Sequence, residues 1–330
     1  MHSAISVRAP LRIALGGGGT DLPSHYRRSG GFVVSAAIDR YVHMRVAPSG
    51  GGCWVLDHLE HEEVSDPARI AHPILRAAVA RHGSGQPLHL TSTGDVEPGT
   101  GLGSSGAYAV AAVKALAVMG GGDLEPAALA EAACRIEIED LARTVGKQDQ
   151  YAAAHGGVNA LTFDRGGSVG VERLELGPRM RSALKERFLL FFTGARRSAA
   201  GVLAGQVQRT LAGDGSLGEN LAATADAARA GRSAIDDDDV DAFAELMDHQ
   251  WQLKRERLAH LPMEQIVELR GLALAGGARA AMLMGAGGGG YLLVFAPDPE
   301  PVRAALTAAG APELTFDLDE SGCRAEREKS

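Results

Sequence analysis

EPGTGLGSSGAYAV, residues 97–110, places four glycines and two adjacent serines between a strand-like segment, QPLHLTSTGDV (86–96), and a helix-like segment, AYAVAAVKALAVMGG (107–121). A turn that opens a helix leaves backbone N–H groups without partners, and these donors attract anions. Glycine lets an anion approach the main chain closely, while Ser104 and Ser105 add hydroxyls suited to a phosphate or to Mg²⁺. The stretch therefore predicts a phosphate-binding loop.

Two common phosphate motifs do not describe this loop. A P-loop requires a Lys followed by Ser or Thr after its last glycine, and no such Lys occurs here. The dinucleotide pattern GxGxxG occurs literally at Gly101, Gly103 and Gly106, but it follows an Asp-Val-Glu-Pro turn rather than a strand. A plain tight turn would also use these glycines, so further motifs must decide between the two interpretations.

Composition limits the class of protein. The chain has 330 residues, 45% hydrophobic and 22% charged, which favours a globular protein of two domains. The net charge of −8 argues against a nucleic-acid or anionic-membrane surface. Cys53, Cys134 and Cys323 show no metal-binding or disulfide spacing, and the sequence has no long apolar run or secretory signal. We expect a cytoplasmic protein with a small-molecule substrate, either a monomer or a homodimer, with no nucleic-acid or membrane partner.

Strand-like and helix-like segments are mixed along the chain, which predicts two α+β sandwiches. We place the domain boundary beside the apolar run RFLLFFTG (187–194), with domains at 1–185 and 186–330. Strands are expected at 5–15, 32–48, 158–164, 169–176, 280–286, 291–297 and 313–319, and helices at 67–83, 107–121, 125–145, 217–235, 240–261 and 263–277.

Three segments carry a family resemblance. APLRIALGGGGTDLP (9–23), EPGTGLGSSGAYAV (97–110) and GAGGGGYLLVF (285–295) resemble, in order and spacing, the three motifs of the GHMP small-molecule kinases. Residues 17–44 and 145–163 are most similar to bacterial kinases of D-glycero-D-manno-heptose 7-phosphate. The resemblance runs from residue 7 to about residue 317. It implies an N-terminal α/β nucleotide-binding sandwich and a C-terminal ferredoxin-like α+β sandwich.

The resemblance implies an ATP site and a Mg²⁺ site. Ser105 and Glu137 match the family's Mg²⁺ ligands. Glu139 competes with Glu137, but on one α-helix the two side chains would point about 200° apart. The ATP phosphates would lie on the glycine loop and the start of the following helix, at Gly99, Gly101, Leu102, Gly103, Ser104, Ser105 and Gly106.

Catalytic and substrate residues follow in the same way. Asp149, in GKQDQY, matches the family's catalytic Asp, and Arg12 matches an arginine beside it. Read without the resemblance, these residues would be a turn cap and a strand arginine reaching solvent. The substrate residues implied by the glycine motifs are Gly18, Gly19, Thr20, Asp21, Gly287 and Gly288. Arg196 and Arg197, after the strand-like run, suit a substrate phosphate, whereas His25, Arg27 and Arg28 are weaker candidates.

One position departs from the family pattern. Met282 stands where close relatives carry a Lys before the third motif. This departure implies either weaker binding of the nucleotide or substrate phosphate, or compensation by another cation, for which Lys147 and Arg143 are the candidates. The expected activity is Mg²⁺- and ATP-dependent phosphorylation of the anomeric hydroxyl of a heptose 7-phosphate. The alternatives are a kinase for an unphosphorylated sugar such as fucose and a non-catalytic sensor with this fold. The superfamily's ATP-dependent decarboxylation is disfavoured by the sugar-type motifs.

Overall fold

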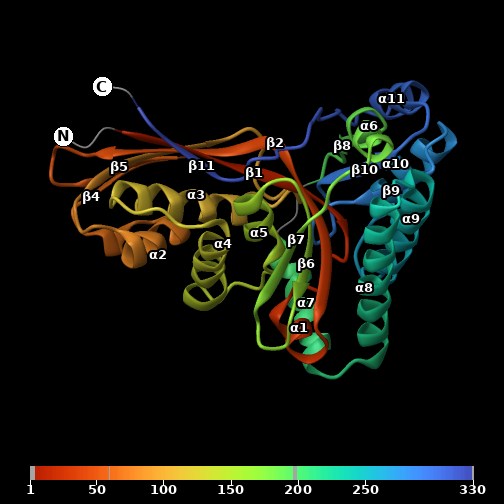
Figure 1. Cartoon of the computed structure of the whole chain (residues 1–330), viewed down its shortest axis with the longest axis horizontal. Helices are drawn as coiled ribbons and strands as arrows, with labels where there is room; N and C mark the ends of the chain where they lie inside the picture. Colours follow the sequence, from red (N-terminus) through yellow and green to blue (C-terminus); the bar gives the residue numbers. More distant parts are fainter. Residues whose placement is uncertain (1–3, 59, 196–198, 329–330) are drawn as a thin grey trace.

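The computed structural model describes residues 4–58, 60–195 and 199–328, and their strands form two sheets (Figure 1). The large sheet has the order β11-β1-β2-β5-β3-β4, with β6 and β7 joined to it through β2. Its strands are β1 (Ile5–Gly16), β2 (Gly31–Pro48), β3 (Trp54–Asp57), β4 (His61–Val64), β5 (Leu88–Gly94), β6 (Val158–Phe163), β7 (Val169–Arg173) and β11 (Arg324–Arg327). The small sheet has the antiparallel order β8-β10-β9, formed by β8 (Phe188–Phe192), β9 (Ala280–Leu283) and β10 (Tyr291–Phe295).

Helices α2 to α5 of the N-terminal half cover one face of the large sheet, whereas α1 lies beside α7 (Figure 1). Helix α3 contacts β1 and β2 and is flanked by α2, α4 and α5. It is rich in alanine and buried on almost every side, so small side chains let it pack closely between sheet and helices. The helical elements here are α1 (Pro23–Ser29), η1 (Pro67–Arg69), α2 (Pro73–His82), α3 (Ser104–Met119), α4 (Pro126–Arg135), η2 (Ile136–Asp140) and α5 (Gln148–His155).

The C-terminal half is mainly helical. The long antiparallel helices α8 and α9 contact each other, α8 packs against β1 and β2, and α9 packs against β9, so this pair joins the two sheets (Figure 1). The helices of the C-terminal half are α6 (Pro178–Glu186), α7 (Ala199–Leu211), α8 (Gly215–Asp236), α9 (Val240–Arg257), α10 (Glu264–Ala275) and α11 (Pro299–Ala308). None of the described helices is long and apolar enough to cross a membrane.

The predicted two-domain α+β class is confirmed, whereas several element boundaries are wrong. The single helix expected at 125–145 is divided into α4, the π-helical turn η2 and an irregular link. The strand expected at 313–319 forms only isolated bridges, Phe191 to Glu313 and Ile38 to Leu318, because this segment passes from one sheet to the other. Strand β11, which was not predicted, pairs with β1 in the large sheet. The boundary at residue 185 stays a prediction.

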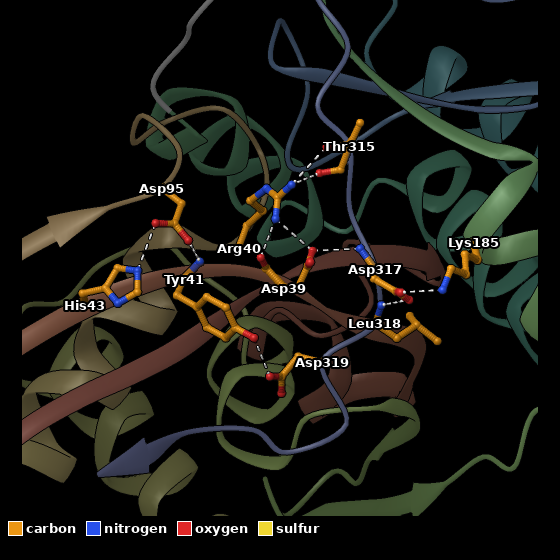
Figure 2. A network of polar contacts seen from close by, with 10 residues as sticks. All are labelled: Asp39, Arg40, Tyr41, His43, Asp95, Lys185, Thr315, Asp317, Leu318 and Asp319. Atoms are coloured by element: carbon orange, nitrogen blue, oxygen red, sulfur yellow. Dashed lines mark hydrogen bonds and ion pairs between the residues drawn. The ribbon is translucent and has the colours of Figure 1, made fainter. Parts of the chain in front are cut away.

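The segment that passes between the two sheets, residues 313–319, contacts β2 where the pairing of β2 with β1 is irregular. The pairing of β1 with β2 shifts register between Pro10 and Leu11, which leaves Asp39 and Arg40 without partners on β1. Asp39 N–H instead donates to the carbonyl of Asp317 at 2.9 Å, and the Asp39 carboxylate accepts from Asp317 N–H at 2.8 Å. Arg40 reaches Thr315, as Figure 2 shows. The bulge thus anchors the chain on its way back to the large sheet.

A buried carboxylate completes this anchor. Asp319 accepts a hydrogen bond from the Tyr41 hydroxyl at 2.9 Å, as Figure 2 shows. It also accepts from Ser321 N–H at 3.0 Å and from Gly322 N–H at 2.6 Å. Burial, together with the bond to Asp319, raises the pKa of Tyr41 to about 12.

Replacing Tyr41 with Phe should therefore reduce stability. The Tyr41→Phe change removes one donor from the buried Asp319, at a cost of about 1 kcal/mol in the free energy of unfolding. Urea denaturation monitored by circular dichroism would measure it as a lower midpoint. An unchanged midpoint would mean that this bond does not hold the C-terminal segment.

Candidate active site

A cavity of about 200 Å³ lies between the two halves of the molecule. Its wall combines β1 and the loop after it, the start of α3, the segment before α5, helix α9 and the loop between β9 and β10. Among the residues predicted from sequence, those that line it are Arg12, Gly18, Gly19, Asp21, Gly99, Gly101, Gly103, Ser104, Ser105, Asp149 and Gly287.

Two glycine loops meet backbone to backbone beside this cavity. A Cβ on Gly101 would lie 2.8 Å from the carbonyl oxygen of Met284, and a Cβ on Gly290 would collide with the carbonyl of Thr100. Both glycines have positive φ, +84° for Gly101 and +110° for Gly290. Tyr291 N–H donates to the carbonyl of Thr100 at 3.2 Å. The second and third glycine motifs therefore form one continuous floor.

The first loop opens helix α3 toward the cavity. Gly103, the residue before the helix, is left-handed with φ 80°, and it provides no side chain to cap the N-terminal N–H groups. Because these donors and the positive end of the helix face the cavity, this is the place in the site that best suits phosphate.

The ion pair of Arg12 and Asp149 stands next to this helix start. Arg12 Nε and Nη2 donate to Asp149 Oδ1 at 2.8 and 2.6 Å. Arg12 is almost fully buried and also donates to the carbonyl of Gly101 at 2.6 Å, whereas the Asp149 side chain keeps 28% of its surface exposed. Asp149 is therefore a fixed carboxylate that remains accessible from the cavity.

A second carboxylate, Asp21, lies close to the first. Its oxygens accept from Gly19 N–H and Gln148 N–H, each at 3.2 Å. Gly146 permits this arrangement, because a Cβ there would overlap the Asp21 carboxylate. Burial raises the pKa of Asp21, and the nearby Asp149 carboxylate raises it further. Two acidic groups thus face one cavity, a geometry suited to binding hydroxyl groups.

Ser105 and Glu137 form the candidate Mg²⁺ site. The Ser105 hydroxyl donates to Glu137 Oε1, and Gln150 Nε2 donates to Oε2 at 2.7 Å. Arg143 Nη1 donates to both Ser105 Oγ (3.1 Å) and Glu137 Oε1 (3.2 Å), so these two oxygens already contact a cationic group. Burial raises the pKa of Glu137. A hydroxyl and a carboxylate beside the phosphate-binding helix are oxygen ligands that Mg²⁺ accepts, so the residues fit this ion.

Glu139 does not share this position. Glu137 is buried, whereas Glu139 is exposed. The local chain is a π-helical turn rather than the α-helix assumed from the sequence, with Leu141 N–H bonded to the carbonyl of Ile136.

Several predicted residues do not reach the cavity. The Thr20 hydroxyl is fully buried and bonds to backbone groups of Gly17 and Phe32, so it stabilises the loop. Leu102, Gly106, Glu137 and Gly288 do not line the cavity either. Arg196 and Arg197 lie outside the described residues.

Gly106 nevertheless leaves the space that the Asp149 side chain needs. It packs against Asp149, and a Cβ there would lie 2.6 Å from the Cβ of Asp149. That contact explains why a glycine follows the two serines.

The compensating cations proposed for Met282 lie elsewhere. Lys147 is bonded to Glu131 and to the carbonyl of Gly167, away from the cavity. Arg143 is bonded at Ser105 and Glu137. The basic side chain at the third motif is Lys254 of α9, which donates to the carbonyls of Leu283 and Gly285.

Sequence reasoning missed the contributions of α7 and α9. Gln206 Nε2 donates to the carbonyl of Gly19 at 3.0 Å, Gln250 Oε1 accepts from Gly17 N–H at 2.8 Å, and Arg257 Nη2 donates to the carbonyl of Gly18 at 3.2 Å. These side chains hold the glycine loop after β1. The alternation of apolar and charged residues in WQLKRERL (251–258) was the only signal, and it is also typical of a solvated helix.

A glycine loop at a helix start, an Arg-bound carboxylate and a hydroxyl–carboxylate pair define the class of a phosphoryl-transfer enzyme of the two-domain kinase type. Comparison with known proteins agrees. Residues 69–157 match the family described as GHMP kinases N terminal domain, and residues 232–312 match GHMP kinases C terminal. Together the two ranges span more than half of the chain, and the chain belongs to the GHMP kinases.

Two relatives match this chain over most of its length. The chain is 28% identical over 303 residues to D-glycero-alpha-D-manno-heptose 7-phosphate kinase of Campylobacter jejuni, covering 88% of this chain and 89% of that protein. It is 27% identical over 321 residues to the bifunctional fucokinase/GDP-fucose pyrophosphorylase of Arabidopsis thaliana, covering 90% of this chain but only 30% of that protein.

A solved structure shares the fold. A D-glycero-D-manno-heptose 1-phosphate kinase from Bacteroides thetaiotaomicron superposes with a TM-score of 0.82 at 23% identity, over 99% of this chain and 100% of that chain. The predicted family and two-domain fold are confirmed.

Replacing Gly106 with Ala should displace Asp149 and abolish most activity in a folded protein. The family resemblance implies that Asp149 is catalytic, and general-base assistance contributes about 10²–10⁴-fold, so we expect a loss of kcat of at least about 100-fold. Steady-state kinetics would measure it. Gly218→Ala is the matched control, since a Cβ at Gly218 in α8 meets nothing within 4 Å. Full activity in Gly106→Ala would show that the position of Asp149 is not critical.

Proposed function

We propose that the protein is a Mg²⁺- and ATP-dependent sugar kinase that phosphorylates the anomeric hydroxyl of a heptose 7-phosphate. The product would be a heptose 1,7-bisphosphate. The observation that carries the proposal is the Arg12–Asp149 ion pair, which faces one cavity together with Asp21 and the open start of α3. In this proposal Asp149 is the base, Asp21 binds sugar hydroxyls and the start of α3 binds phosphate, and all three line the same cavity.

Asp149, Arg12 and Asp21 have different roles in the proposed reaction. Asp149 accepts the proton of the anomeric hydroxyl as that oxygen bonds to the γ-phosphorus of ATP, and the bond from phosphorus to the oxygen bridging the β- and γ-phosphates breaks to release ADP. Arg12 fixes Asp149 by two hydrogen bonds and presents positive charge to the group in transfer. Asp21 accepts hydrogen bonds from sugar hydroxyls, and so orients the ring.

The glycine loop would hold the nucleotide. Gly99, Gly101, Gly103 and Ser104 line the cavity and provide main-chain donors without side chains that obstruct a phosphate. Ser105 and Glu137 would hold Mg²⁺, which neutralises charge on the phosphates when bound.

The choice of a phosphorylated heptose has separate support. The Campylobacter jejuni relative, matched over nearly its whole length, is named a heptose 7-phosphate kinase. A kinase for an unphosphorylated sugar is the second candidate, because the Arabidopsis thaliana relative contains a fucokinase.

A substrate panel tests the proposal. We expect ADP release from Mg-ATP with D-glycero-D-manno-heptose 7-phosphate, and far less with mannose 6-phosphate, fucose, galactose or mevalonate. The Asp149→Asn variant should lose at least about 100-fold in kcat, whereas Asp226→Asn, a change at an exposed carboxylate paired with Arg229, should not. Turnover of fucose alone would favour the second candidate. ATP binding without turnover of any sugar would favour a non-catalytic sensor.

The metal site predicts a pH effect. Because burial raises the pKa of Glu137, this carboxylate becomes protonated at a higher pH than an ordinary glutamate as the solution is acidified. The Mg²⁺ concentration for half-maximal activity should therefore rise on acidification, starting above the usual glutamate range. Mg²⁺ titrations at several pH values would measure this.

The variant Glu137→Gln provides the comparison for that titration. It should need about tenfold or more Mg²⁺ at neutral pH and should lose the acid-dependent change. An unaltered Mg²⁺ requirement in Glu137→Gln would remove Glu137 from the metal site.

A further inference from the structure

Two basic side chains of α9, Lys254 and Arg257, face the cavity from one side of the helix. They are three residues apart, so they lie on neighbouring turns of the same helix face. Neither was among the residues predicted from the sequence, and neither has a role in the proton transfer assigned to Asp149.

Lys254 is held by neutral groups only. Its Nζ donates to the carbonyl oxygens of Leu283 at 2.6 Å and Gly285 at 2.5 Å, in the third glycine motif. An ammonium group has three donors, so one N–H remains for a ligand. Within the described part of the chain, Lys254 has no ion pair.

Arg257 is bound in the same manner. Its Nη1 donates to Asn220 Oδ1 at 2.8 Å and to Thr224 Oγ1 at 2.6 Å, and its Nη2 donates to the carbonyl of Gly18 at 3.2 Å. These contacts fix the guanidinium beside the loop that carries Asp21, and they leave further N–H donors unused. No carboxylate of the described residues forms an ion pair with it.

Keeping Lys254 and Arg257 charged at this position costs free energy. Burial lowers the pKa of Lys254 to about 7, with further lowering by Arg257 and Arg12, and burial lowers the pKa of Arg257 to about 10. The nearby carboxylates do not neutralise them, because Asp149 is bonded to Arg12 and Asp21 to two backbone amides. An anion in the cavity would provide the missing charge.

We propose that Lys254 and Arg257 form an anion subsite that binds a phosphoryl group during the reaction. That group is either the phosphate monoester that the acceptor sugar already carries or the γ-phosphoryl group that ATP transfers, and both present anionic oxygens to the two cations. The identity of the acceptor rests on the proposed function, but the presence of the subsite does not.

Binding of inorganic phosphate tests the subsite directly. We would titrate phosphate into the protein by isothermal calorimetry with Mg-ADP present, so that the glycine loop is filled. Lys254→Met and Arg257→Met should each weaken phosphate binding about tenfold to a hundredfold, the loss expected for one charged hydrogen bond. Arg255→Met is the matched control, because Arg255 is an exposed residue of the same helix. Unchanged affinity in both cavity variants would overturn the proposal.

A pH series keeps the proposal testable if a Met variant fails to fold. Sulfate remains a dianion across the neutral range, so its binding reports the protein groups alone. The charged groups that face Lys254 are Arg12 of β1, Asp149 of α5, Arg257 of α9 and Asp21 in the loop after β1. Wild-type affinity for sulfate should fall as the pH rises through about 7, where Lys254 loses its proton. Lys254→Arg should keep its affinity, and a fall of the same size in this variant would contradict the assignment.

Kinetics distinguish the two sources of phosphate. If the subsite holds the acceptor's own phosphate, Arg257→Met should raise KM for a phosphorylated sugar at least tenfold and leave kcat within about twofold. If it holds the group in transfer, kcat should fall with every acceptor while KM stays constant. Wild-type protein that binds phosphate but turns over no sugar would refute the proposed function and leave the subsite intact.

Discussion

Close contact between two glycine loops is the constraint on which the site depends. Residues 99–103 and 284–291 pack main chain against main chain, and neither Gly101 nor Gly290 has room for a side chain. This packing joins a loop of the large sheet to a loop of the small sheet, so the start of α3 and the face of α9 come to line a single cavity. The two halves of the chain therefore form one site rather than two.

The charged groups in and beside the cavity form two ion pairs and leave an excess of positive charge. Arg12 is paired with Asp149, and Arg143 with Glu137, so each of these carboxylates is held in position by a cation. Lys254 and Arg257 instead contact neutral oxygens. An enzyme that moves a phosphoryl group must bind several negative charges at once, and the excess positive charge of the cavity lining suits them. Burying those charges lowers the stability of the protein when no anion is bound.

The sequence predicts the fold class and the phosphate loop because both depend on local patterns. Glycines at a strand-to-helix turn and alternating apolar runs can be recognised without knowing the tertiary structure. Arg12 and Asp149, far apart in the chain, were identified only through the family resemblance. Lys254 and Arg257 were missed because a charged residue on an amphipathic helix looks the same whether it faces solvent or a cavity. The π-helical turn that sets Glu137 and the path of residues 313–323 depend on packing that no local pattern encodes.

The most direct test of the account is the identity of the reaction product. Phosphorus NMR of a reaction of the enzyme with Mg-ATP and D-glycero-D-manno-heptose 7-phosphate would follow every phosphate group at once. We expect ADP and a sugar with two phosphate resonances, one of them coupled to the anomeric proton. Release of ADP together with free inorganic phosphate, and with the heptose 7-phosphate unchanged, would contradict it.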